Sequence, residues 1–188
     1  MDYLSFVPAW LGIPTADLAV AIVITALAAI LQGTIGLGFA VMSVPLLLLV
    51  DPRLAPGPQL LVTLPLTLAT CWREREGVCV RSACMVLGGR VPGTLLGVLL
   101  LKWAAGAWLH KLIGGIVLVA SLVLVSPYQF KRTKLTEFVA GVFSGVGSMV
   151  AAIGGPPLAL VFSGSTGPQL RSNLAFIFAV GVVFTICV

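Results

Sequence analysis

Residues 18–50 read LAVAIVITALAAILQGTIGLGFAVMSVPLLLLV, 33 consecutive positions without an Asp, Glu, Lys, Arg or His. A helix needs about 20 apolar residues to cross the hydrocarbon core of a bilayer. The run is continuous, whereas a membrane β-barrel strand alternates apolar and polar residues. Because lipid offers no hydrogen bonds, backbone inside it must form helices or a closed barrel. The stretch therefore predicts helix embedded in a membrane, interrupted by the glycines between positions 33 and 38.

The composition of the whole chain agrees with this prediction. Charged residues make up 9% of the 188 residues and hydrophobic residues 59%, whereas soluble domains contain roughly 25% charged residues. Such a chain lacks the polar surface of a water-soluble protein. We therefore predict an all-α, polytopic integral membrane protein whose main partner is the lipid bilayer. Further uncharged runs cover 54–72, 112–130, 138–170 and 172–188.

Neither the cysteines nor the charges indicate catalysis, a cofactor or a nucleic-acid partner. Cys71, Cys79, Cys84 and Cys187 form no CxxC pair and the chain has a single His, so no metal or redox site is expected. The 11 basic residues exceed the 6 acidic ones but are scattered between the apolar runs. This distribution is typical of loops retained on the cytoplasmic side of a membrane.

Glycines, prolines and charges divide the chain into expected helices. Each helix is expected to end where such residues interrupt an apolar run, and glycine pairs inside a run are predicted to break a helix within the membrane. The expected helices are 18–33 and 39–50, 58–72, 81–103 with an interruption at 88–93, 110–125, 137–162 with breaks at 145–147 and 154–157, and 168 to the end.

The order of these elements contains an internal repeat. A shift of 112 positions places Gly33 on Gly145 and Pro45 on Pro157, and a shift of 110 places Pro-Gln-Leu at 58–60 on the same triplet at 168–170. We predict two related repeats built around glycine-broken helices and inverted with respect to each other, as in many transporters. The predicted organisation is an N-terminal segment 1–17, a first membrane repeat 18–126, a cytoplasmic basic loop 127–136 and an incomplete second membrane repeat 137–188.

The second repeat is expected to lack about two helices relative to the first, which ends near Val125. Two explanations stay open: the chain is truncated, or another chain supplies these helices, for example in a homodimer. The positive-inside rule places the Lys and Arg residues of loops 73–81 and 127–136 in the cytoplasm. An inverted first repeat must then begin outside, so 18–50 crosses and returns as a hairpin. A single kinked span is the alternative.

The two glycine-rich breaks are predicted to carry function. Freed backbone groups inside a membrane are tolerated where they line a polar cavity, and paired broken helices direct their N-termini at anionic substrates. The alternative is that the glycines only allow close helix packing. The predicted substrate-binding residues at the breaks are Gln32, Gly33, Thr34, Gly36, Gly38, Ser43, Pro45, Ser144, Gly145, Ser148, Gly154, Gly155, Pro156 and Pro157.

Two further residues join this predicted site. Arg90 is the one full charge expected well inside a span, and such a residue is a functional hypothesis, because a guanidinium binds anions through forked hydrogen bonds. Alternatively, a helix break around Arg90 lets its side chain extend to the membrane surface. Asn173 is expected either to line the cavity or to cap a helix start.

These segments resemble a known family. Residues 31–47 (LQGTIGLGFAVMSVPLL) and 145–158 (GVGSMVAAIGGPPL) resemble the two signatures of the TauE/SafE family, and 91–97 (VPGTLLG) resembles its middle helix. The commonest first signature has three adjacent glycines, whereas Leu37 and Phe39 flank Gly38 here. The resemblance implies a multi-pass permease of the bacterial inner membrane that exports sulfite or an organosulfonate such as sulfoacetate. A membrane-embedded cofactor-bearing subunit and an inactive structural fragment stay open as alternatives.

Overall fold

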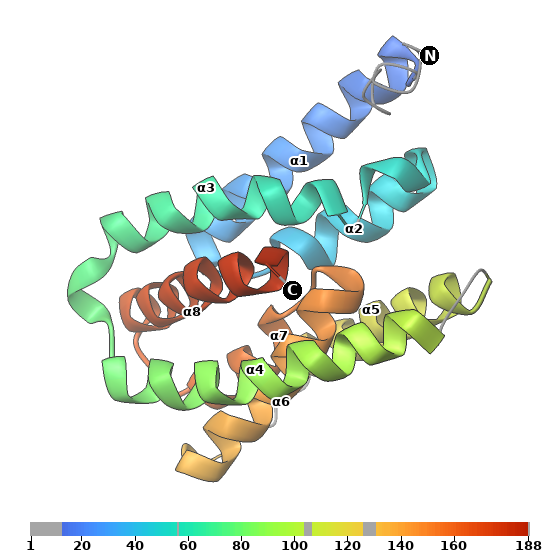
Figure 1. Cartoon of the computed structure of the whole chain (residues 1–188). Coiled ribbons are helices and arrows are strands. Elements are labelled where there is room, and N and C mark those ends of the chain that lie inside the picture. Colours follow the sequence, from blue (N-terminus) through green and yellow to red (C-terminus); the bar gives the residue numbers. More distant parts are fainter. Residues whose placement is uncertain (1–12, 56, 104–106, 126–130, 188) are drawn as a thin grey trace.

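The computed structural model describes residues 13–55, 57–103, 107–125 and 131–187 (Figure 1). The expected N-terminal segment 1–17 and basic loop 127–136 therefore lie partly outside the described residues. Helices make up nearly all of this part of the chain, and it contains no strand. The helices are α1 (Thr15–Ile35), α2 (Phe39–Val50), α3 (Gly57–Arg73), α4 (Val80–Trp103), α5 (Ala107–Val125), α6 (Lys134–Ala151), α7 (Gly155–Phe162) and α8 (Gly167–Cys187), with short 3-10 turns η3 (Pro52–Leu54) and η4 (Arg75–Gly77).

The predicted all-α membrane fold class is confirmed. Among the described residues, α1, α4, α8 and the segment Pro52–Arg73 are each long and apolar enough to cross a bilayer. α2 is a shorter apolar helix of 12 residues, about 18 Å long at 1.5 Å per residue. The protein therefore combines full-length spans with short helices that end inside the bundle.

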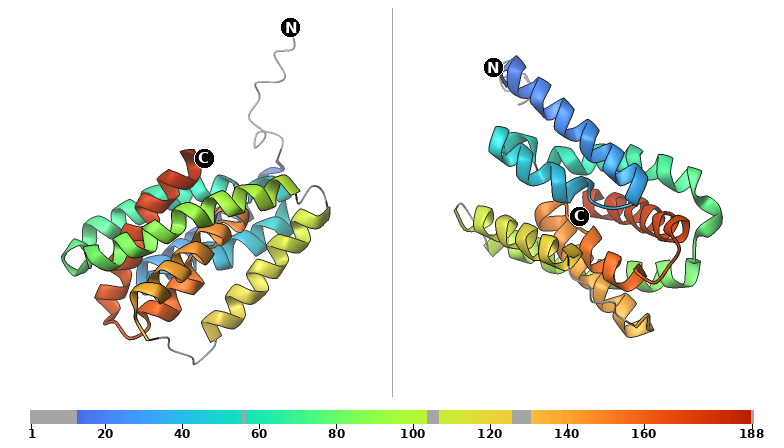
Figure 2. Two further views of the ribbon diagram at one scale, coloured as in Figure 1. Left: turned by 60° about the horizontal axis from the view of Figure 1, so that its bottom comes forward. Right: turned by 180° about the vertical axis from the view of Figure 1, so that it is seen from behind.

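α1 and α2 form a helical hairpin, so the alternative of a single kinked span is wrong. The two helices pack against each other and run in opposite directions (Figure 2). Gly36 and Gly38 have φ values of 91° and 106°, a left-handed conformation that other residues adopt only with strain. The break begins at Gly36 and not at Gly33, because Gly33 and Thr34 still belong to α1.

α6 and α7 form a second hairpin, and α3 and α8 follow the two hairpins in the same order. α6 ends at Ala152, which has φ 57°, and α7 begins after Gly154. Gly36 and Ala152 are 116 positions apart, as are Gly38 and Gly154. The expected register of 112 is therefore wrong at the break by one helical turn, and Pro45 in the middle of α2 does not correspond to Pro157 in the first turn of α7.

α4 and α6 pack backbone against backbone, which corrects two predicted breaks. Both helices are continuous, through 88–93 and through 145–147 respectively. A Cβ atom at Gly89 or Gly93 would collide with backbone of α6, and one at Gly145 would lie 2.6 Å from the Arg90 carbonyl oxygen. These glycines therefore serve close helix packing and do not interrupt the helices.

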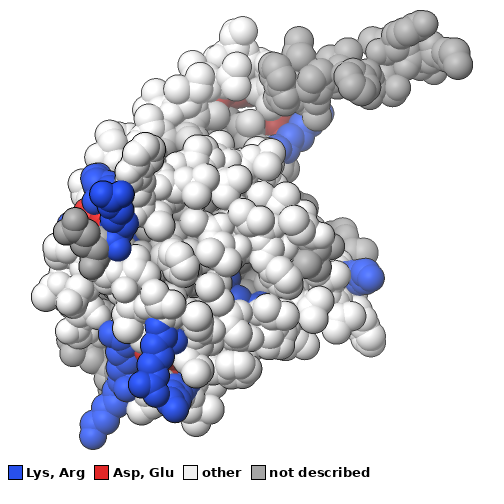
Figure 3. All heavy atoms as spheres, turned by 60° about the vertical axis from the view of Figure 1, so that its left-hand side comes forward, with Lys and Arg blue, Asp and Glu red and all other residues white. Residues whose placement is uncertain are grey.

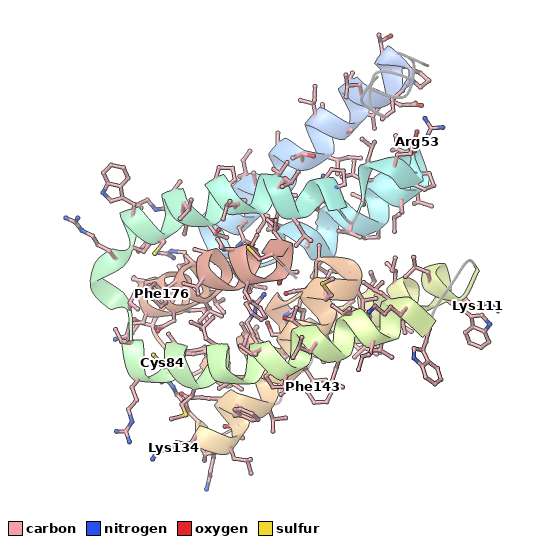
Figure 4. All side chains as sticks on the ribbon, in the orientation of Figure 1. Arg53, Cys84, Lys111, Lys134, Phe143 and Phe176 are labelled. Carbon is pink, nitrogen blue, oxygen red and sulfur yellow. The ribbon has the colours of Figure 1, made fainter. Side chains whose placement is uncertain are left out.

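Most of the basic residues gather at one end of the molecule, where α3 finishes and α4, α6 and α8 begin. We call this the basic end; its residues are Arg73, Arg75, Arg81, Lys131, Arg132, Lys134 and Arg171. Figure 3 brings this side forward and shows Lys and Arg in separate groups with acidic residues beside them. Lys134 lies at this end, while Arg53 and Lys111 lie at the other (Figure 4). The basic end corresponds to the loops predicted to face the cytoplasm, and its sidedness stays a prediction.

The contact between α4 and α6 predicts opposite effects for two neighbouring glycines. Gly89→Ala is expected to lower the stability by about 1–3 kcal/mol, the usual effect of overpacking, because its Cβ would meet the Phe138 carbonyl oxygen. Gly88→Ala has no heavy atom within 4 Å and is expected to leave stability unchanged or raise it by about 0.5–1 kcal/mol. Thermal unfolding of both detergent-purified variants measures the difference, and equal melting temperatures would contradict the observed packing.

Candidate functional site

A small pocket lies where the two hairpins meet. Its volume is about 40 Å³, above the roughly 10–15 Å³ that one water requires. From α1, α2, α3 and the first break it is lined by Gln32, Gly38, Phe39, Ala40, Val41, Leu60 and Thr63. From α6, α7, α8 and the second break it is lined by Ser148, Ala152, Ile153, Gly154, Gly155, Phe178 and Val182.

The first half of the pocket is organised by the side chain of Gln32. Its Nε2 donates to the Gly36 carbonyl at 3.3 Å, and its Oε1 accepts from the Phe39 amide at 3.2 Å. The side chain, 4% exposed, thus bridges the break and satisfies one of the free amides that begin α2. Both polar ends of the Gln32 side chain are therefore paired within this half of the site.

The second half is organised by Ser148, which lies one turn before the end of α6. Gly154, the residue that precedes α7, packs directly on the Ser148 hydroxyl, and a Cβ there would also lie 2.9 Å from Ser144 Oγ. No side chain caps the N-terminus of α7. The two hydroxyls and the start of α7 therefore lie against one another without the internal pairing seen at Gln32.

Arg90 lies directly behind Ser148. Its Nη2 donates to Ser148 Oγ at 2.9 Å, its guanidinium carbon lies 6.0 Å from the centre of the Phe178 ring, and its residue is 2% exposed. The guanidinium packs on Gly181 of α8, where a Cβ would collide with it. Arg90 is therefore buried among α4, α6 and α8, and the alternative that it extends to the membrane surface is wrong.

The polar atoms around Arg90 are incompletely paired. Nε and Nη1 of Arg90 have no hydrogen-bond partner, and neither do the hydroxyls of Thr94 and Ser144. Buried donors normally have partners, and a buried charge normally has a counter-ion. Among the described residues the ion pairs involve other arginines: Arg73 and Arg171 with Glu74, and Arg132 with Glu137. The site thus has unused hydrogen-bond donors and an uncompensated positive charge.

Two helix N-termini add to this positive potential. Phe39 and Gly155, the first residues of α2 and α7, both line the pocket. A helix N-terminus carries a partial positive charge, and such ends bind anions. The Phe39 amide is bonded to Gln32 and Pro156 and Pro157 have no N–H, so the amide of Gly155 is the donor at the start of α7. The arrangement of a buried guanidinium, a hydroxyl and two helix starts around a small space is suited to a small anion. Among the described residues, no group of three or more His, Cys, Asp or Glu could hold a metal ion.

The predicted site residues divide into those that line the pocket and those that do not. Gln32, Gly38, Ser148, Gly154 and Gly155 line it. Gly36 shapes the first break from outside the pocket wall, and Gly145 packs against α4. The others outside the wall are Gly33, Thr34, Ser43, Pro45, Arg90, Ser144, Pro156, Pro157 and Asn173.

Several of these outlying residues have a defined place. Pro156 and Pro157 line a separate apolar groove between α5, α6 and α7, on the other side of the second break. Asn173 connects helices: its Oδ1 accepts from the Cys79 amide at 2.8 Å, and its Nδ2 donates to the carbonyl oxygens of Gln169 and Gly77. Asn173 lies inside α8 and bonds to the residue that precedes α4, so it links two helices and does not cap the start of its own helix.

The apolar part of the pocket wall was missed by sequence reasoning. Phe178 and Val182 lie one turn apart on α8, and Leu60 and Thr63 on α3. Thr63 stands out only as the repeat counterpart of Asn173. The apolar residues have no distinguishing signal, because the same helices contain many other Leu, Val and Phe residues.

Comparison with known proteins identifies one family. The family model described as sulfite exporter TauE/SafE matches residues 21–188. No curated protein and no solved structure matches the chain. The matched region includes both hairpins, α4 and every residue that lines the pocket.

The contacts of Asn173 predict a structural effect. Asn173→Leu removes the bonds that the side chain makes to the Cys79 amide and the Gly77 carbonyl, and is expected to destabilise the protein by about 1–3 kcal/mol. Thr185→Val is the matched control, because the Thr185 hydroxyl bonds only to Gly181 in its own helix. Melting temperatures measured in detergent test this, and a smaller loss for Asn173→Leu than for the control would contradict the role.

Proposed function

The chain belongs to the TauE/SafE sulfite exporter family, a family of membrane transporters, and from this premise we propose that it exports sulfite or an organosulfonate such as sulfoacetate through the pocket between the two hairpins. The proposed location is the bacterial inner membrane, with the basic end in the cytoplasm. The substrate, the binding residues and the direction are the proposed parts.

One observation carries the proposal: a buried guanidinium with two unpaired nitrogen donors, Nε and Nη1, lies behind a pocket between two helix starts. Placing a charge at the centre of a membrane helix costs at least about 2.5–3.5 kcal/mol on insertion scales. Every folded molecule bears this free-energy cost, so a function that requires the positive charge best explains why Arg90 is buried there. A sulfur oxyanion offers the acceptor oxygens that the free donors lack.

We assign distinct roles to the residues around the anion. Ser148 is the direct contact, because its hydroxyl lies in the pocket wall and is polarised by Arg90. Arg90 supplies most of the positive potential from behind it. Phe178 and Val182 form an apolar wall that suits the carbon part of an organosulfonate. The amides near Gly154 and Gly155 complete the polar side.

The membrane potential is sufficient to drive this transport outward. An inside-negative potential favours the exit of an anion by about 2.3 kcal/mol per charge for each 100 mV. A site that offers one buried cation and lets the anion leave toward the positive side needs no separate energy source. We therefore propose export without a coupled proton.

The proposal predicts that Arg90→Gln abolishes transport. Efflux of radiolabelled sulfite from proteoliposomes is expected to fall at least about tenfold, because truncating one partner of a buried charge pair costs roughly 2–5 kcal/mol. Ser148→Ala is expected to weaken efflux less, since Arg90 stays. Arg81→Gln, an exposed residue of the same helix, is the matched control and should transport normally.

A folding defect is separated from a transport defect by a second measurement. Each variant is checked for a monodisperse gel-filtration peak and for a cooperative melting transition in the absence of sulfite. A folded Arg90→Gln protein that still exports sulfite at the wild-type rate would refute the assigned role of Arg90.

A further inference from the structure

Three charged residues tie the end of α1 to α3 and α8 at the basic end. Arg171 Nε lies 3.1 Å from Glu74 Oε1, and Arg73 Nη2 lies 3.3 Å from the same oxygen. The two arginines also reach α1: Arg73 Nη2 donates to the Gly33 carbonyl at 2.7 Å, and Arg171 Nη1 to the Thr34 carbonyl at 3.4 Å. Glu74 thus holds two arginines that cap the same helix.

The C-terminus of α1 is suited to this contact. The last carbonyl groups of a helix have no partner within it and carry partial negative charge, which favours arginine donors. Gly36 leaves room for α8: a Cβ there would lie 2.7 Å from Arg171 Cγ and 3.0 Å from its Cα. Arg171 is therefore seated in the notch at the first break, and its side chain is 24% exposed.

This cluster and the pocket share two helices, α1 and α8, and lie close together on each of them. Gln32 lines the pocket, and the next two residues of α1 provide the carbonyl groups that the arginines bind. On α8, Phe178 and Val182 lie seven and eleven positions after Arg171, which places all three on one face of the helix with Phe178 about 10 Å from Arg171 along the axis. The cluster is thus positioned between the pocket and the basic end.

The hairpin that the cluster holds has few other attachments. Most large side chains of α1 are exposed, among them Ile22 at 62% and Ile30 at 64%, and its main packing partner is α2. α4 and α6, in contrast, are locked by direct backbone contact. A rigid body and a lightly attached hairpin, with the pocket between them, are the components of transporters that rock one bundle against another.

We propose that Arg73, Glu74 and Arg171 form a latch that closes the pocket toward the basic end and opens when the α1–α2 hairpin moves; this rests on the transport function proposed above. The three residues are positioning residues, because they touch α1 and not the pocket. Opening breaks the two bonds to the α1 carbonyl groups and frees Gly36 from Arg171. The anion then has a path between Gln32 and the basic end.

The test measures access to the pocket independently of transport. The four native cysteines are replaced, and Thr63→Cys, which places a thiol in the pocket wall, is labelled with an anionic methanethiosulfonate added at the basic end of protein reconstituted in one orientation. Glu74→Gln is expected to raise the labelling rate about three- to tenfold, the range for losing a partly exposed ion-pair network. Asp51→Asn is the matched control, because the Asp51 carboxylate bonds only to the Arg53 amide at the other end.

Variants of Arg171 determine whether the residues act as one unit. Arg171→Met is expected to open the pocket as much as Glu74→Gln, and Arg171→Lys to restore most of the closure. The double variant Glu74→Gln/Arg171→Met should match each single variant, since contacts of one unit are not additive. The latch would be overturned if Glu74→Gln left the labelling rate unchanged. It would also be overturned if the rate increases of the two single variants multiplied in the double variant.

The outcome also separates the latch from the transport function. Latch-dependent labelling in a protein that moves no sulfite would support the latch and refute the substrate. If sulfite efflux were normal but the labelling rate of Thr63→Cys did not change in the Glu74 and Arg171 variants, the latch alone would be refuted. Gel filtration of every variant confirms that the labelled protein is folded.

Discussion

Direct contact between the backbones of α4 and α6 is the constraint on which the rest of the structure depends. Lipid supplies no hydrophobic force between helices, so their association relies on close van der Waals contact. Gly89, Gly93 and Gly145 remove the side chains that would keep the two helices apart. Arg90 lies within this contact surface. The close packing of α4 and α6 therefore also places its guanidinium within hydrogen-bond distance of Ser148 on α6.

The surroundings of Arg90 keep its positive charge available. Its aromatic neighbour and the glycine on α8 shield it from lipid, and Ser148 accepts only one of its N–H groups. A carboxylate at this position would neutralise the cation permanently. Glu74 and Glu137 instead pair with arginines at the basic end. Charge pairing is thus concentrated at the end of the bundle, and the unpaired cation lies beside the pocket.

Sequence alone predicted the helices well and the breaks less well, for a physical reason. Long apolar runs between charges determine where helices lie, and α3, α4 and α8 begin and end within one or two residues of the expected bounds where those were given. Glycine, however, serves two purposes in a membrane helix, breaking it or allowing close packing, and only the partner helix decides which. Gly145 packs against α4, so the break predicted at 145–147 is absent. The break predicted at 154–157 is present, but it begins at Ala152, a residue with no break signal. Five predicted site residues line the pocket, but its apolar wall has no sequence signal.

The two breaks differ in how their polar groups are paired, and this gives the two hairpins different roles. Gln32 pairs with both ends of the first break, while the Gly33 and Thr34 carbonyl groups at the end of α1 accept bonds from Arg73 and Arg171. The second break leaves Ser144 and the start of α7 beside an unpaired guanidinium. The first break thus keeps its Gln32 bonds when the arginines let go of α1 at the basic end, whereas the buried cation of the second half must stay covered. The asymmetry therefore favours an anion held by the α4–α6–α7 side while the α1–α2 side opens and closes over it.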